Sequence, residues 1–226
     1  MDLLGCLSDL GVREVPMFVL THYHADHTGG APALIDRFSP SLVLVRGGDP
    51  PRWLADAVRR VGGELRSAVE GEEVAAGEAR WVTVSAPQPQ NRATELTDAE
   101  GSPENDASVV GIAEVGGVRV MLAGDAEPSG QARALRSARR LGLDLSVAVL
   151  KLPHHGSARQ EERFFRACGA SLAVASAGQD NGYGHPAQAA LDLATGLGMA
   201  VARTDRQGAV AVARTDDGLT VTTERR

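Results

Sequence analysis

The sequence predicts an α/β fold in which helices cover two packed, mixed β-sheets. Two observations support this class. Short apolar runs of strand length alternate with segments of helical periodicity, as in Met17–Leu20 followed by 31–38. A later pair of strands flanks Gly116-Gly117, which indicates an antiparallel hairpin. At 226 residues and 43% hydrophobic content, the chain is expected to form a single domain over residues 1–226.

The first part of the chain alternates between the two element types. Leucines at helical spacing predict a helix over 2–10, and Pro16 introduces the buried strand 17–20. Pro32 suits the first turn of a helix over 31–38, which Ser39-Pro40 ends. The same alternation predicts a strand at 42–45, a helix at 51–61 and a strand at 65–69.

The second part begins with a strand at 81–85. The polar stretch 87–106 has almost no apolar periodicity and is predicted to be a long loop. The elements expected after it are the hairpin strands 108–115 and 118–123, helix 129–141, strand 145–150, helix 159–168, strand 171–176, helix 186–197 and three short strands within 199–223.

Charge and composition exclude several classes of protein. The net charge of −6 and the pI near 5.5 argue against a surface that coats nucleic acid, so a nucleic-acid substrate would be held locally. No apolar run has the length of a membrane span, and the start lacks a secretion signal. The chain as given is therefore expected to be soluble and cytoplasmic, without membrane insertion.

All 6 histidines fall in three short segments, each after a predicted strand. They are His22-Tyr23-His24-Ala25-Asp26-His27, His154-His155 and His185. Histidines two apart in an extended segment project to the same side, and strand ends bring ligands from distant segments together. A single histidine is more often a surface or core residue, but four potential ligands within 22–27 indicate a metal site.

Asp125 also ends a predicted strand, as the histidine segments do. An aspartate at such a place is commonly a turn residue or a helix cap, yet a two-metal site needs a bridging anion and a carboxylate serves well. Glu127 is expected to favour the start of the next helix through the helix dipole. Lys151, the single lysine, is placed either to contact a phosphate or as a solvated charge at a strand end.

These motifs resemble a known family. His22-x-His24-x-Asp26-His27 is similar to the signature of the metallo-β-lactamase superfamily, whose αββα sandwich it implies. The segments 105–110, 122–127, 150–157 and 183–186 further resemble the C-terminal hydrolase domain of ComEC-type competence proteins, membrane proteins that take up DNA. The resemblance covers nearly the whole chain.

The resemblance implies two divalent ions, zinc or manganese, because mixed imidazole and carboxylate ligands suit both metals. It assigns to one ion His22, His24, Asp125 and His155, with His154 as the alternative to His155, and to the other Asp26, His27, Asp125 and His185. Catalytic roles are expected for Asp26, His154 and Lys151, with His154 orienting a ligand or protonating the leaving group. Asn105 and Asp106 either orient the site or form a turn into the next strand.

One departure from the family concerns the start of the chain. Such domains begin several tens of residues earlier, with a strand hairpin that supports the metal site, so this chain is expected to lack the first N-terminal strands. The membrane-spanning portion of the relatives is also absent. A fragment, a misplaced start and a stand-alone relative all fit this pattern.

Three functions follow from these residues. The first is a phosphodiesterase or DNase of competence DNA uptake, in which a hydroxide bridging two metal ions attacks phosphorus, with single-stranded DNA as substrate and a membrane uptake channel as partner. The second is hydrolysis of a small ester, lactone or phosphocholine-like ester, which the acidic charge balance suits. The third is an inactive, truncated module that docks to a membrane channel.

Overall fold

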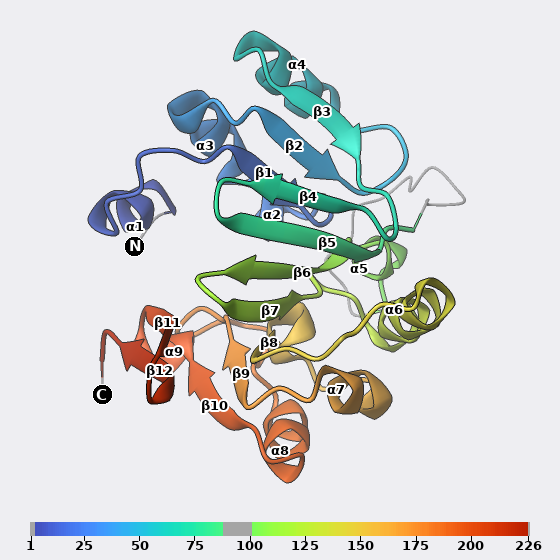
Figure 1. Cartoon of the computed structure of the whole chain (residues 1–226), viewed down its shortest axis with the longest axis vertical. Coiled ribbons are helices and arrows are strands. Elements are labelled where there is room, and N and C mark those ends of the chain that lie inside the picture. Colours follow the sequence, from blue (N-terminus) through green and yellow to red (C-terminus); the bar gives the residue numbers. More distant parts are fainter. Residues whose placement is uncertain (1–2, 88–100, 226) are drawn as a thin grey trace.

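The computed structural model describes residues 3–87 and 101–225. Two β-sheets form its centre, and helices lie outside them (Figure 1). The helices are α1 (Leu3–Asp9), α2 (Ala25–Thr28), α3 (Ala31–Phe38), α4 (Arg52–Arg60), α5 (Pro103–Asp106), α6 (Pro128–Leu141), α7 (Glu162–Cys168), α8 (Gln188–Gly196) and α9 (Thr204–Gln207), with a 3-10 turn η1 (Pro153–Gly156).

The smaller sheet contains β1 (Met17–Leu20), β2 (Leu42–Val45) and β3 (Glu64–Ser67), in that order and parallel throughout. A mixed sheet was expected here. The described strands are parallel because a helix fills each connection: α3 joins β1 to β2, and α4 joins β2 to β3. Parallel crossovers of this kind place the carboxyl ends of all three strands at one edge.

The larger sheet is mixed, as predicted, with the order β10-β9-β8-β7-β6-β5-β4. Its strands are β4 (Glu73–Ala76), β5 (Ala79–Ser85), β6 (Val110–Val115), β7 (Val118–Leu122), β8 (Val149–Lys151), β9 (Leu172–Ala175) and β10 (Ala200–Arg203). The predicted hairpin is confirmed, since β6 and β7 pair antiparallel around Gly116-Gly117. From β7 to β10 the strands are parallel.

Three apolar clusters lie between the layers of the expected αββα sandwich. Leu44 of the small sheet and Trp81 of the large sheet belong to one cluster, which lies between the sheets. Ile35 and Leu54 bring α3 and α4 onto the outer face of the small sheet. The outer face of the large sheet packs against α6, α7 and α8 through a cluster that includes Ala134, Phe164, Phe165, Leu191 and Ala194.

The last two strands, β11 (Val210–Thr215) and β12 (Gly218–Thr223), form a separate antiparallel hairpin. Val210, Val212 and Leu219 pack with Val149 and Leu172 of the large sheet. The hairpin thus covers part of the sheet face opposite α6 to α8, and the short strands predicted within 199–223 are confirmed.

Some expected elements differ in extent. The strand predicted at 145–150 forms only at 149–151, and β4, with alternating exposed and half-buried residues, was not predicted. Within the predicted loop 87–106, residues 103–106 form α5, whereas 88–100 lie outside the described residues. Short helices and edge strands carry too little apolar periodicity to be detected from sequence. Among the described residues, no helix combines the length and apolarity that a membrane crossing requires.

Candidate metal centre

The predicted ligands lie directly after the carboxyl ends of strands from both sheets or in the connections that follow them. The histidine segment 22–27 follows β1, and Asp125 follows β7. His154 and His155 lie in η1, directly after β8, and His185 lies in the connection from β9 to α8. Because β7, β8 and β9 are parallel neighbours, their ends meet at one edge of the large sheet.

All six histidines form one continuous group. Neighbouring imidazole rings have centroids between 4.2 and 6.1 Å apart, in the order His24, His22, His27, His155, His154 and His185. Segments separated by more than a hundred residues therefore share one site. The structure brings together all the residues predicted to bind metal.

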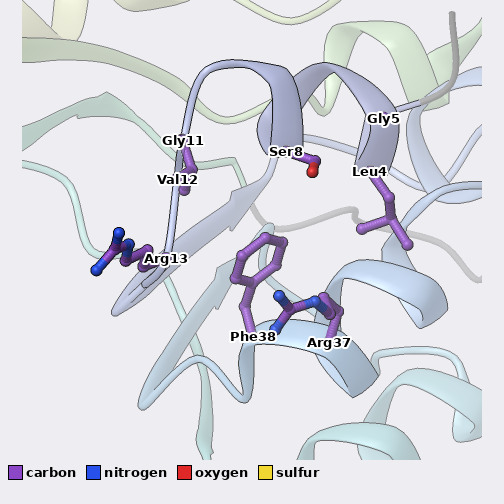
Figure 2. A pocket seen from close by; sticks show the side chains of 8 residues that line it. All are labelled: Leu4, Gly5, Ser8, Gly11, Val12, Arg13, Arg37 and Phe38. Atoms are coloured by element: carbon purple, nitrogen blue, oxygen red, sulfur yellow. The ribbon is translucent and has the colours of Figure 1, made fainter.

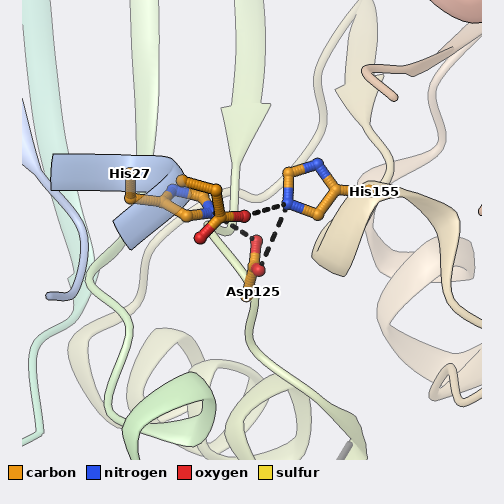
Figure 3. Close-up of side chains that lie close together, drawn as sticks. His27, Asp125 and His155 are labelled. Carbon is orange, nitrogen blue, oxygen red and sulfur yellow. Dashed lines mark hydrogen bonds and ion pairs between the residues drawn. The ribbon is translucent and has the colours of Figure 1, made fainter. Parts of the chain in front are cut away.

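Asp125 occupies the middle of this group and is only 2% exposed. Its Oδ1 lies 3.1 Å from His27 Nε2, and its Oδ2 lies 3.4 Å from His155 Nε2. Figure 3 shows these two imidazoles on either side of the carboxylate. His22 Nε2 and His154 Nε2 lie 3.9 and 3.8 Å from the same Oδ2. A carboxylate with imidazoles on both of its oxygens is placed to bridge two cations.

The ligand atoms of Asp26, His27, Asp125 and His155 all lie within 4.8 Å of one another. His155 Nε2 is 3.1 Å from Asp26 Oδ2. The side chain of His155 thus lies with Asp26 and His27, whereas the resemblance assigned it to the ion held by His22 and His24. The division of ligands between two ions stays a prediction.

Electrostatics of the site favour metal-binding protonation states at two residues. Burial and the neighbouring His27 lower the pKa of His22 to about 3, so its imidazole is neutral. Burial raises the pKa of Asp125, but hydrogen bonds from His155 and His27 outweigh it and keep the pKa well below its usual range. Neutral imidazole and ionised carboxylate are the forms that coordinate metal.

Asp26 and His155 shift each other's titration. The hydrogen bond with His155 lowers the pKa of Asp26 to about 2. For His155, burial lowers the pKa, but hydrogen bonds to Asp125 and Asp26 raise it to about 9. The positive charge of a protonated His155 is therefore stabilised by the carboxylates of Asp125 and Asp26.

A divalent cation fits the donor set. His22 Nε2 is buried and makes no hydrogen bond among the described residues. Buried polar atoms usually have a partner, and imidazole nitrogens with carboxylate oxygens are the ligands that zinc and manganese accept. The same donors suit both metals, so the residues present fit a divalent ion without selecting one.

Side chains and backbone outside the ligand set orient these imidazoles. His22 Nδ1 lies 3.1 Å from Thr21 Oγ1 and 3.3 Å from Ser108 Oγ. Ser108 Oγ also accepts a hydrogen bond from the amide of Asp125, at 3.1 Å. His155 Nδ1 contacts the Ser176 carbonyl at 2.7 Å, which directs Nε2 towards the carboxylates. Local sequence places Ser108 at the start of a strand and within the segment 105–110, and neither feature indicates this role.

Glu127 is a second residue whose role was missed. It is 2% exposed, and its Oε1 lies 3.5 Å from His154 Nδ1. The same oxygen accepts hydrogen bonds from the Gly101 amide at 2.6 Å and from Asn105 Nδ2 at 3.4 Å. Glu127 is the N-cap residue of α6, which is its expected place at the helix start, and its side chain also makes a buried contact with His154. The sequence signal for this role is the position of Glu127, two residues after the predicted ligand Asp125.

Asp106 and Lys151 have contrasting surroundings. Asp106 Oδ1 accepts hydrogen bonds from the amides of Glu127 and Gly130, so this side chain holds the first turn of α6. Burial lowers the pKa of Lys151, and the charges of Asp125 and Asp26 oppose that shift. Lys151 Nζ donates to the Leu152 carbonyl at 3.3 Å. Its contact with a phosphate stays a prediction.

A separate cavity of about 540 Å³ lies between α1 and the end of α3 (Figure 2). Its lining residues are Leu4, Gly5, Ser8, Gly11, Val12, Arg13, Arg37 and Phe38. None of the predicted metal ligands lines it, and its ionisable side chains are both arginines. It is therefore distinct from the metal centre.

Two known proteins match most of this chain in sequence. The chain is 27% identical over 215 residues to ComE operon protein 3 of Bacillus subtilis strain 168, covering 92% of this chain and 26% of that protein. It is 28% identical over 207 residues to competence protein ComA of Neisseria gonorrhoeae, covering 90% of this chain and 26% of that protein. The chain thus spans about a quarter of these relatives.

A solved structure supports the fold alone. A mutant of the CmlA beta-hydroxylase superposes with a TM-score of 0.53 at 16% identity, covering 84% of this chain and 43% of that one. The family model of the metallo-beta-lactamase superfamily matches residues 9–172, which include the segment 22–27, Asp125 and both histidines of η1. The chain therefore belongs to the metallo-beta-lactamase superfamily.

Proposed function

We propose that this chain is a metal-dependent phosphodiesterase that cleaves single-stranded DNA. The observation that carries the proposal is the buried Asp125 carboxylate, which has imidazole nitrogens on both oxygens at 3.1 and 3.4 Å. A site of this charge and donor type suits a substrate whose reaction develops negative charge, as phosphodiester hydrolysis does.

The ions would be held by the ligands predicted from sequence, namely His22, His24, Asp26, His27, Asp125, His155 and His185. Two divalent ions, zinc or manganese, supply an activated water and neutralise charge on the phosphate when bound. The assignment is supported by the single group that these side chains form and by the buried His22 Nε2, which makes no hydrogen bond among the described residues.

Three protein groups are proposed to act on the substrate. His154 would protonate the leaving oxygen through Nε2, since Glu127 lies 3.5 Å from the opposite ring nitrogen and orients the imidazole. Lys151 would contact a nonbridging phosphate oxygen. Asp26 would act both as a ligand and by holding His155, whose Nε2 lies 3.1 Å away.

The biological setting is inferred from the relatives. Two proteins named for competence match 90% or more of this chain, and the match covers 26% of each of them. We therefore assign the DNase to competence DNA uptake, next to a membrane channel and on the cytoplasmic side. Docking to that channel belongs to the same proposal.

A direct assay tests the phosphodiesterase. The purified chain is loaded with zinc or manganese, and its metal content is measured. It is then incubated with end-labelled single-stranded DNA, with bis-p-nitrophenyl phosphate and with p-nitrophenyl acetate. Cleavage of DNA that is lost in His24→Ala supports the proposal, whereas a metal-loaded chain that leaves both phosphodiesters intact rejects it.

A second candidate is hydrolysis of a small ester, lactone or phosphocholine-like ester. The net charge of −6 favours it, because a long polyanion would be repelled by much of the surface. Turnover of the small ester without DNA cleavage in the same assay would select this candidate.

A further inference from the structure

A buried ion pair lies beside the metal-binding loop and belongs to none of the predicted ligand or catalytic sets. Glu104 of α5 is 3% exposed, and Arg46, which follows β2, is 7% exposed. Arg46 Nε donates to Glu104 Oε1 at 2.8 Å. Arg46 Nη1 also donates to the Gly47 carbonyl at 2.9 Å. The pair thus connects two elements that are distant in sequence.

Both members of the pair contact Tyr23, the residue between His22 and His24. The Tyr23 amide donates to Glu104 Oε1 at 3.0 Å. The Arg46 guanidinium lies over the Tyr23 ring, 4.4 Å from its centroid. Tyr23 itself is 5% exposed. Its main chain and its ring are therefore held by the same two side chains.

Fold stability alone does not account for such a pair. Removing two charges from water is costly, and replacing a buried ion pair by apolar residues of similar volume is often neutral or stabilising. Apolar side chains could fill this space, but they could not accept the Tyr23 hydrogen bond. The charge pair is suited to fixing one particular backbone amide.

The position of that amide matters for the imidazoles on either side of it. In an extended segment, His22 and His24 project to the same side only while the backbone between them keeps its orientation. The backbone at His24 is extended, with φ −64° and ψ 154°, just before α2 begins. Anchoring the Tyr23 amide therefore sets the direction in which both rings point.

We propose that Glu104 and Arg46 are positioning residues, which hold the Tyr23 backbone so that His22 and His24 present their nitrogens to a metal ion. This inference rests on the proposed function, because it requires that these two histidines bind metal. Glu104 and Arg46 act through Tyr23 and belong neither to the predicted metal ligands nor to the groups proposed to act on the substrate.

Two double variants separate positioning from folding. Arg46→Gln with Glu104→Gln removes both charges but keeps a carbonyl oxygen for the Tyr23 amide. Arg46→Met with Glu104→Leu fills the space with apolar groups and removes the acceptor. The control is Arg66→Met with Glu72→Leu, a partly buried pair at 2.7 Å that has no hydrogen bond to a predicted ligand among the described residues.

The measurements are zinc affinity by competition with a chromophoric chelator, the visible spectrum of the cobalt(II) form, and urea unfolding without metal. The apolar pair should lower zinc affinity about 10- to 100-fold and alter the cobalt spectrum. The Gln pair should retain most of the affinity, and the Arg66 and Glu72 control should match the wild type. The unfolding midpoints of the two site variants should lie close together.

Contrary results are distinguishable. Wild-type affinity and cobalt spectrum in the apolar pair would overturn the positioning role while leaving the proposed function intact. A wild-type chain that binds neither zinc nor cobalt would overturn both. If the apolar pair does not fold, Arg46→Lys replaces it: the charge remains but the planar group over Tyr23 is lost, so a changed cobalt spectrum supports the role and an unchanged one overturns it.

Discussion

The two histidine-bearing turns of the metal centre are built by different means. In the first, residues 21–28, the backbone is ordinary, and side chains from other segments hold it: Glu104 binds the Tyr23 amide, and Ser108 contacts His22. In the second, residues 153–156, the backbone itself is unusual, with φ of 47° at His154 and 54° at His155. The first turn thus depends on side chains from other segments, whereas the second depends on left-handed backbone at its two histidines.

The difference shows two ways to aim an imidazole. Left-handed backbone at a residue other than glycine is costly, so the surroundings must enforce it. The His154 amide donates to the Gly124 carbonyl at 3.1 Å, and the His155 ring contacts the Ser176 carbonyl at 2.7 Å. The second turn is therefore sensitive to backbone changes, and the first to the loss of distant side chains.

The largest effect is expected at Asp125, which contacts His27 of the first turn and His155 of the second. Asp125→Asn keeps the shape of the side chain but removes the charge between His27 and His155. Zinc affinity should fall by more than about 100-fold, because changes in groups that only orient ligands already cost about 10- to 100-fold. Metal content after dialysis measures this. Full occupancy of two ions in the variant would contradict a bridging role.

The second-largest effect is expected in the turn at residues 153–156, where the backbone is left-handed. Gly156→Ala should lower the free energy of unfolding by about 2–3 kcal/mol, since φ is +84° there and an added Cβ would lie 2.8 Å from Pro186 Cβ. Urea unfolding of the metal-free protein measures it. Gly142→Ala is the control, with φ +67° but no heavy atom within 4 Å of the added Cβ. Equal losses of unfolding free energy in the two variants would show that the contact with Pro186 does not contribute to the destabilisation.

A smaller effect is expected in the turn at residues 21–28, which side chains from other segments hold. Ser108→Ala removes the partner of the Asp125 amide and a contact to His22. The cost should be about 1–3 kcal/mol, the range for a buried donor that is left unsatisfied. Thermal unfolding and zinc affinity measure the two consequences. A stable variant with unchanged zinc affinity would remove Ser108 from the set of positioning groups.

The smallest effect lies away from both turns. Glu70 accepts hydrogen bonds from Ser137 and Arg140 of α6. Burial raises its pKa, but these bonds and that from the Ala86 amide outweigh it, so the pKa is lowered. Its contribution is therefore present above the ordinary pKa of glutamate and is lost as the pH falls through the lowered value.

Glu70→Gln should accordingly cost only a few tenths of a kcal/mol up to about 1 kcal/mol near neutral pH, as partly exposed pairs do. The difference from wild type should disappear in acid. Urea unfolding as a function of pH checks this, and zinc affinity should be unchanged. A loss of metal binding would mean that α6 positions the site more strongly than the contacts of Asp106 and Glu127 indicate.

The sequence alone determined the fold class, most strand positions and the set of residues that gather at the site. Strands such as β1 are continuous apolar runs, and the segment 22–27 carries four potential ligands directly after one of them. Periodicity and local spacing record such features because they depend on neighbours along the chain.

Only the tertiary structure decided which groups orient the ligands. Glu104 lies 81 residues from Tyr23, and Ser108 lies 86 residues from His22, so no local pattern connects them. The contact of Glu127 with His154, and the position of His155 beside Asp26, likewise arise when the ends of β1, β7 and β8 meet. Contacts of this kind depend on packing in three dimensions, which the order of residues does not display.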